Sequence, residues 1–279
     1  MHEHHPHPTA GFPVELPYIL ITNDDGVESP GIHAAVRAAA EVAPVLVAAP
    51  TTQQSAKGRA LSGNPDDHFH PIDLELEDMK YPVSAWHIDA TPALTVEHAL
   101  RVLCVDRKPA LVVSGINYGE NLGVDIGSSG TVGAAFQAAA NGVPALAISR
   151  ATDVAHHFVH GDIEWEEVTR VAARWISRVL ALENSPFDVL KIDIPDECNE
   201  DTGERFTTMS RSRYFGFRLS DPDSHTPLKA TETFVNVDSG SLDPHSDIYA
   251  VAVDGLISIT PLILERTGDL DAARRAFGM

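Results

Sequence analysis

The sequence predicts an α/β fold, in which a doubly wound, mostly parallel sheet carries helices on both faces and is followed by a β-rich C-terminal extension. Three observations indicate it. Short strands alternate with amphipathic helices. The strands are rich in Val, Ile, Leu and Ala along nearly their whole length, as expected when helices cover both faces of a parallel sheet. After residue 195 the alternation gives way to shorter β-type runs.

The first β-α-β unit covers residues 18–49. YILIT at 18–22 is the first predicted strand, a helix follows over 30–42, and PVLVAA at 44–49 is the second strand. Pro30 stands where a first helical turn accepts proline, and apolar residues recur after it at helical spacing. The start of this helix is therefore well marked.

The same alternation continues to residue 195. The further predicted elements are a strand at 83–88, a helix from Thr91-Pro92 to 103, a strand at 110–115, a helix over 131–140, a strand at 144–149, a helix from about Asp162 to 182, and a strand at 187–195. We expect residues 15–195 to form one domain.

Residues 196–279 differ in character and are expected to complete the same fold as an extension used in oligomerisation. Strands are predicted at 205–212, 231–237, 247–253 and 256–262, and a short helix near 270–277. We expect this extension to act as an arm that contacts another subunit.

Composition excludes several classes of function. The chain has 279 residues, with 40 Asp plus Glu against 20 Lys plus Arg, and a formal charge of −20 at pH 7. Such a chain does not hold a nucleic-acid polymer by counterion release, and an anionic membrane surface is equally disfavoured. No apolar run approaches the roughly 18 residues of a membrane span, so we expect a cytoplasmic protein. The two cysteines give no disulfide framework.

Histidines crowd the N-terminus at positions 2, 4, 5 and 7. A His-rich tract of this kind can chelate a transition metal, but nothing in the flanking sequence would order it. We therefore expect a disordered tail over residues 1–14, apart from the functional site.

Polar residues gather where three predicted strands end, which is where open α/β sheets bind ligands. The first strand runs into Asp24-Asp25-Gly26, the second into a loop over 51–62, and the strand at 110–115 into a glycine-rich loop over 115–123. Adjacent carboxylates at the end of a buried strand would be satisfied by a divalent cation, Mg²⁺ or Mn²⁺. Turn chemistry alone is the alternative for the pair.

A second feature is the Ser129-Gly130-Thr131 turn, which directly precedes a predicted helix. Free backbone amides and the positive end of the helix dipole suit a phosphate there. A simple N-cap at Ser129 or Thr131 is the alternative interpretation. Together with the carboxylates, the turn suggests adjacent cation and anion sites.

Three segments in order resemble the SurE family of survival-protein nucleotidases. They are NDDGVESPGI after the first strand, SGINYGENLGVDIGSSGTVGAA in the middle and DIYAVAVDGLISITPL near the end. The similarity runs from about Pro17 to Leu262. It implies a Rossmann-like fold, a C-terminal region used for homodimer or homotetramer assembly, and a metal-dependent phosphomonoesterase acting on nucleoside 5′- and 3′-monophosphates.

The resemblance also implies roles for particular residues. Asp24 and Asp25 would be catalytic and, with Ser55 and Asn117, would ligate one divalent ion per subunit, Mg²⁺ or Mn²⁺. Asn121 and the Ser129-Gly130-Thr131 turn would bind the substrate phosphate. The mechanistic hypothesis is attack on phosphorus by a metal-activated water, with either Asp24 or Asp25 as the base.

Other functions remain open on sequence alone. One is a phosphatase acting mainly on other phosphate esters or short polyphosphate, and another is a nucleotide-binding module without turnover. Lys57 and Arg59 either add positive charge to the site or are ordinary solvent-exposed loop cations.

Overall fold

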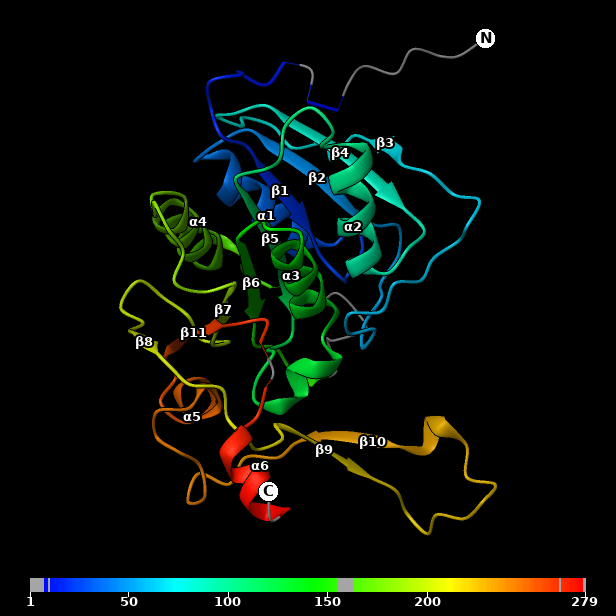
Figure 1. Ribbon diagram of the computed structural model, residues 1–279, viewed down its shortest axis with the longest axis vertical. Coiled ribbons are helices and arrows are strands. Elements are labelled where there is room, and N and C mark those ends of the chain that lie inside the picture. Colours follow the sequence, from blue (N-terminus) through cyan, green and yellow to red (C-terminus); the bar gives the residue numbers. More distant parts are fainter. Residues whose placement is uncertain (1–7, 10, 155–162, 266, 278–279) are drawn as a thin grey trace.

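The computed structural model describes residues 8–9, 11–154, 163–265 and 267–277, and it confirms the α/β prediction. Figure 1 shows a twisted central sheet with helices packed on both of its faces. The main sheet contains β1 (Ile19–Thr22), β2 (Val45–Pro50), β3 (His70–Ile72), β4 (Val83–Ile88), β5 (Leu111–Tyr118), β6 (Ala145–Arg150), β7 (Val189–Ile194), β8 (Glu204–Phe206) and β11 (Ile257–Leu262). The helices are α1 (Pro30–Ala40), α2 (Pro92–Val102), α3 (Gly130–Ala140), α4 (Glu166–Leu180), α5 (Asp247–Ala252) and α6 (Leu270–Ala276).

The strand order in this sheet is β3-β4-β2-β1-β5-β6-β7-β11-β8. Six neighbouring strands, from β4 to β7, run parallel, whereas β3 pairs antiparallel with β4 and β11 pairs antiparallel with β7. The chain builds outward from β1 toward β4 and then crosses to β5 on the other side of β1. The reversal places a ligand-binding crevice beyond the carboxyl ends of β1 and β5.

Two apolar cores lie on opposite faces of the sheet. Ile19, Ile21 and their neighbours pack under α1 and α4, whereas Leu20 and Leu46 pack under α2 and α3. Because successive residues of a strand point to opposite faces, a strand buried on both sides must be apolar throughout. This explains the continuous apolar runs from which the strands were predicted.

Helix α1 begins at the predicted residue. The Ser29 hydroxyl accepts from the amide of Ile32 at 3.3 Å, and Pro30 follows as the first helical residue. The helix ends at Ala40, two residues before the predicted end, where the chain turns toward β2.

In the C-terminal region the structure differs from the predicted strands. The prediction of a strand over 247–253 is wrong, because this segment forms α5. Ser246 caps this helix by accepting from the amide of Tyr249 at 3.3 Å, and its alternating small and apolar residues also suit one buried helical face. The strand predicted over 205–212 is confined to β8, and the short strand β3 was not predicted.

Strands β8 and β11 extend the main sheet, while β9 (Phe215–Arg218) and β10 (Glu232–Val235) form a separate antiparallel hairpin. In Figure 1 this hairpin projects away from the main sheet. A short 3-10 turn, Leu228–Ala230, lies in the connection between its strands. The hairpin lies within the C-terminal region for which an arm was predicted.

Near the N-terminus, the histidines at 2, 4, 5 and 7 lie outside the described residues. Phe12, which falls within the expected tail, is buried against Tyr18 with ring centroids 5.9 Å apart. Arg107 donates to the carbonyl oxygens of Val14 and Leu16 at 2.6 and 2.8 Å. The C-terminal end of the expected tail is therefore packed against the domain. None of the helices described combines the length and apolar character needed to cross a membrane.

Candidate active site at the sheet switch point

A cavity of about 200 Å³ lies at the carboxyl ends of β1 and β5. It brings together five of the eight site residues predicted from the sequence: Asp24, Ser55, Asn117, Asn121 and Ser129. These residues come from three separate loops, the first after β1, the second after β2 and the third running from the end of β5 to the start of α3. Asp25 and Gly130 are each adjacent in the chain to a residue that lines the cavity, and Thr131 contacts the lining residue Asp24 through its hydroxyl.

The two aspartates are buried, each with only 4% of its surface exposed, and each is held by specific donors. The Thr131 hydroxyl donates to Asp24 Oδ1 at 2.5 Å. The amide of Tyr118 donates to Asp25 Oδ2 at 2.9 Å, and the Gln53 side chain donates to Asp25 Oδ1 at 3.1 Å. Gly26, with φ of +96°, then turns the chain away after the pair.

Burial raises the pKa of both carboxyl groups, and the charge of Asp25 raises the pKa of Asp24 further. Hydrogen bonds from Thr131 and Tyr118 act in the opposite direction but do not cancel this effect. Two adjacent carboxyl groups in such surroundings are costly to ionise without a positive partner. The pair therefore has the electrostatic character of a cation site.

The other proposed ligands lie on neighbouring loops. Asn117 is near the end of β5, and its side-chain amide donates to the carbonyl oxygen of Gly119 at 2.6 Å, which leaves its amide oxygen as the ligand atom. Ser55 lies in the loop after β2. The amide of Gly58 in that loop donates to the Ser128 carbonyl at 2.8 Å, so the two loops are tied together beside the cavity.

The Ser129-Gly130-Thr131 turn opens α3, as predicted. Ser129 caps the helix by accepting from the amide of Val132 at 3.1 Å. Thr131 has no exposed surface, and both its hydroxyl and its amide bond to Asp24, so in this structure it positions the carboxylate. The positive end of the α3 dipole thus lies directly against Asp24.

Gly130 permits this close approach, because a Cβ at that position would lie 2.7 Å from both Cβ and Oδ2 of Asp24. We expect Gly130→Ala to displace Asp24 and to lower kcat by at least about tenfold, as the loss of an orienting contact does at metal sites. Steady-state phosphate release is the measurement. Gly127→Ala is the matched control, since a Cβ there meets nothing within 4 Å; equal activity of the two variants would contradict the expectation.

Sequence reasoning missed the network that supports Asn121. The Asn121 amide donates to Asp193 Oδ1 at 2.8 Å, and the Lys191 ammonium donates to the Asn121 carbonyl oxygen at 2.8 Å. Lys191 also pairs with Asp193 and, at 3.2 Å, with Asp247, and all three side chains are fully buried. Two charged residues spaced two apart in the otherwise apolar strand β7 are the signal from which this network could have been found.

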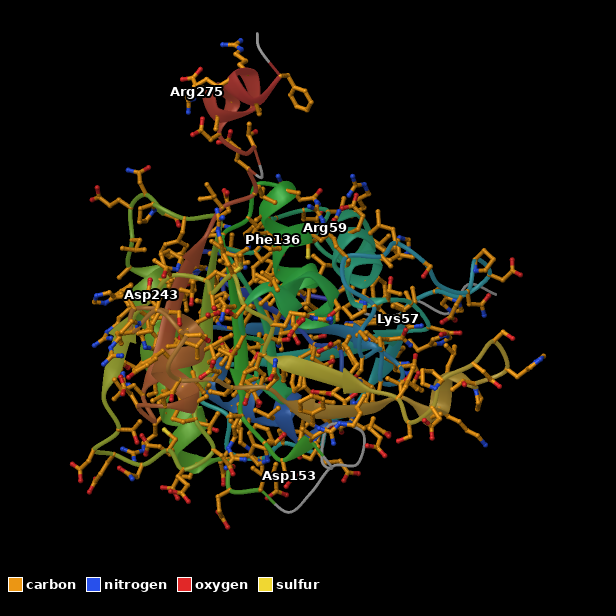
Figure 2. All side chains as sticks on the ribbon, turned by 90° about the horizontal axis from the view of Figure 1, so that it is seen from below. Lys57, Arg59, Phe136, Asp153, Asp243 and Arg275 are labelled. Atoms are coloured by element: carbon orange, nitrogen blue, oxygen red, sulfur yellow. The ribbon has the colours of Figure 1, made fainter. Side chains whose placement is uncertain are left out.

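The two loop cations differ in their surroundings. The Nε of Arg59 donates to Gln137 Oε1 at 2.7 Å, and Figure 2 shows Arg59 beside α2 and α3. Gln137 in turn donates to Glu97 Oε2 at 2.6 Å. Arg59 therefore ties the loop after β2 to these helices, away from the residues lining the cavity, and Lys57 does not line the cavity either.

The projecting hairpin also reaches the cavity. Phe215 and Phe217 of β9 and Thr233 of β10 line it together with the polar residues. Asp125 anchors the hairpin by accepting from the amides of Tyr214 and Phe215 at 2.8 and 2.9 Å. The cavity thus has a wall of carboxylate and amide groups and a wall with two aromatic rings.

The fold and the cavity define a doubly wound α/β protein with a cavity lined by a buried carboxylate at its topological switch point. The sequence model of the family described as "Survival protein SurE" matches residues 19–216. The chain belongs to the SurE family, which confirms the resemblance found in the sequence.

Similar proteins cover nearly the whole chain. A "5'-nucleotidase SurE" of Methanopyrus kandleri is 37% identical over 258 residues, which are 91% of this chain and 94% of that protein. A protein of the same description from Thermococcus gammatolerans is 33% identical over 261 residues, covering 91% of this chain and 92% of its own length. The crystal structure of the SurE protein from Aquifex aeolicus aligns with a TM-score of 0.72 at 27% identity, covering 94% of this chain and all of that one.

Proposed function

We propose that the protein is a metal-dependent phosphomonoesterase that hydrolyses nucleoside 5′-monophosphates, and 3′-monophosphates, to a nucleoside and phosphate. The observation that carries this proposal is the single cavity that combines Asp24, Asn117 and Asn121 with the aromatic side chains of the hairpin. The first set suits a cation and a phosphate, and the second suits a nucleobase. Relatives described as 5'-nucleotidases support the same activity.

The residues present fit one Mg²⁺ or Mn²⁺ ion per subunit. Asp24, Asp25, Ser55 and Asn117 offer hard oxygen ligands, and the buried carboxylate pair has no cationic side chain among its hydrogen-bond partners in the described part of the chain. When bound, such an ion supplies a Lewis acid that activates water and offsets charge on the phosphoryl group.

The chain's own residues position the reacting groups. Thr131 fixes the orientation of Asp24, and Tyr118 and Gln53 fix that of Asp25. We propose that either Asp24 or Asp25 accepts the proton of the attacking water. We propose that Asn121 and the Ser129-Gly130-Thr131 turn bind the phosphate, at the positive end of the α3 dipole.

The nucleoside is proposed to bind against Phe215 and Phe217. A base that stacks on an aromatic side chain gains about 1–3 kcal/mol, which distinguishes a nucleotide from a small phosphate ester. Phe217 has 55% of its surface exposed and carries the Arg213 guanidinium 5.0 Å from its ring centroid. Its free ring surface is therefore available to a ligand.

We also propose that the protein assembles as a homodimer or homotetramer through the C-terminal region. Exposed apolar side chains on the hairpin and on α6 support this proposal: Leu228 is 94% exposed, Leu270 62% and Phe277 82%. Large apolar residues that project on an arm commonly mark a protein interface.

A substrate panel tests the proposed function. Phosphate release is measured from AMP, GMP, 3′-AMP, glycerol phosphate and tripolyphosphate with Mn²⁺, Mg²⁺ or EDTA. We expect nucleotides to be the best substrates and EDTA to abolish turnover. Preferential hydrolysis of tripolyphosphate would instead favour the polyphosphate phosphatase, and tight nucleotide binding without turnover would favour a binding module.

Phe217→Ala sharpens this test. We expect it to raise KM for AMP about tenfold, from lost stacking, and to leave glycerol phosphate hydrolysis unchanged. Phe206→Ala is the control, because Phe206 is also exposed, at 66%, but packs on Trp175, with ring centroids 5.9 Å apart, and does not line the cavity. Equal losses on both substrates would count against a nucleobase site at the hairpin.

A further inference from the structure

A second group of potential metal ligands lies at the β3 edge of the sheet. One ligand atom from each of Asp67, His68 and His70 falls within 4.8 Å of the other two. None of these residues lines the catalytic cavity. Strand β3 is separated from β1 by two strands, so three strand spacings of about 4.8 Å place the group well away from Asp24 and Asp25.

The backbone aligns the two imidazoles on one side of the chain. Phe69, between the two histidines, is buried with 7% exposure and its ring stacks on His98 at 5.5 Å between centroids. Because alternate residues of an extended chain point to opposite sides, His68 and His70 both point outward. Their ring centroids are 4.4 Å apart, which confirms that they face one another.

The carboxylate of Asp67 is already fixed in place. Its Oδ2 accepts from the amide of Asp89 at 2.8 Å, and its Oδ1 lies 2.7 Å from Nε2 of His70. Opposite His70 on β4 is His87, whose Nδ1 lies 2.9 Å from the Thr51 hydroxyl. The group therefore combines an anchored carboxylate with two imidazoles, beside a third imidazole on the paired strand.

We propose that Asp67, His68 and His70 form a second metal site, for Zn²⁺ or a similar imidazole-binding ion, distinct from the catalytic centre. Two imidazoles and one carboxylate are ligands that Zn²⁺ accepts, with a water as the fourth ligand. Ligands of a tetrahedral Zn²⁺ lie about 3.3 Å apart, given bonds of about 2.0–2.1 Å. The distance between Asp67 Oδ1 and His70 Nε2 therefore has to increase by about 0.6 Å for both atoms to bind such an ion. Rotation of the exposed His68 side chain brings one of its ring nitrogens to the same ion.

Zinc stoichiometry tests the proposal. The full chain, stripped with a chelator, is dialysed against Zn²⁺ alone and its bound zinc is measured by elemental analysis. We expect the wild type to bind one more Zn²⁺ per chain than His68→Ala/His70→Ala. The N-terminal histidines and the catalytic residues are common to both proteins, so their zinc cancels in the difference. Equal zinc in the two proteins would overturn the proposal.

Two further measurements control for folding and for location. His225→Ala/His245→Ala removes two exposed imidazoles elsewhere and should bind as much zinc as the wild type. Mn²⁺-dependent phosphate release by His68→Ala/His70→Ala should match the wild type, which shows both an intact fold and a separate site. Loss of zinc together with loss of this activity would contradict a distinct site.

If the double variant does not fold, the exposed single variant His68→Gln keeps the proposal testable. We expect it to weaken Zn²⁺ binding at least about tenfold and to change the visible absorption of bound Co²⁺, which reports ligand geometry. An unchanged affinity and spectrum would overturn the assignment of His68. This inference does not depend on the proposed nucleotidase activity, which Asp24→Asn tests separately.

Discussion

Asp24→Asn is expected to lower kcat for AMP by at least about 100-fold with Mn²⁺ present. The substitution removes a negative charge from the buried pair at the end of β1, which burial and mutual repulsion make costly to ionise without a bound cation. Loss of partners that merely support a metal ligand costs about 10–100-fold, so loss of a ligand should reach or exceed the upper end. Steady-state phosphate release and Mn²⁺ binding by calorimetry are the two measurements.

Thr131→Val is the matched comparison for this experiment. It removes the hydroxyl that donates to Asp24 Oδ1 while keeping the carboxylate and the shape of the side chain. We expect an intermediate loss, with Mn²⁺ still bound. Turnover of Asp24→Asn at the wild-type rate, or unchanged activity of the wild type in EDTA, would refute the metal-dependent mechanism.

Lys191→Ala is expected to lower the free energy of unfolding by about 3–5 kcal/mol, the usual effect of removing one partner from a buried ion pair. Burial acts to lower the pKa of Lys191, but Asp193 and Asp247 outweigh it and raise that pKa, so the ammonium is charged. Its removal leaves two buried carboxylates without a counter-charge. Chemical denaturation is the measurement.

Arg101→Ala provides the control for Lys191→Ala. Arg101 forms a 2.5 Å ion pair with Glu97 on the surface of α2, with 59% of its side chain exposed. An exposed pair of this kind contributes at most about 1 kcal/mol. A loss of stability at Lys191 no greater than that at Arg101 would show that the buried cluster does not stabilise the fold. Lys191→Ala should also lower kcat/KM, because Lys191 holds the backbone of Asn121.

Much of the fold was predictable because its signals are local. Strand β1 is apolar up to its last residue, Thr22, since both of its faces are buried, and Ser29-Pro30 marks the start of α1 in the sequence itself. The position of Asp24 and Asp25 then follows from topology, since the end of a first parallel strand meets the switch point. Cavity-lining residues on three loops could be selected for the same reason.

The parts that were not predicted depend on contacts between distant residues. Phe215 and Phe217 line the cavity from a hairpin that is anchored to Asp125, about 90 residues earlier in the chain. The hydrophobic periodicity of the sequence does not predict a contact between residues so far apart. The segment 247–253 reads equally well as a strand or as a helix, because its apolar residues are short and closely spaced. Its cap at Ser246 decides between the two.

The buried cluster of Lys191, Asp193 and Asp247 also affects the order in which parts of the chain fold during synthesis on the ribosome. Asp247 joins the cluster through an ion pair with Lys191, and its Oδ2 accepts from the amide of Gly123 at 3.0 Å. Domains begin to fold from the N-terminus during synthesis, but here the loop after β5 lacks one of its anchors until Asp247 has emerged. The nascent chain can therefore build most of the parallel sheet early, whereas the loop over residues 115–123 gains this anchor only after Asp247 has been synthesised.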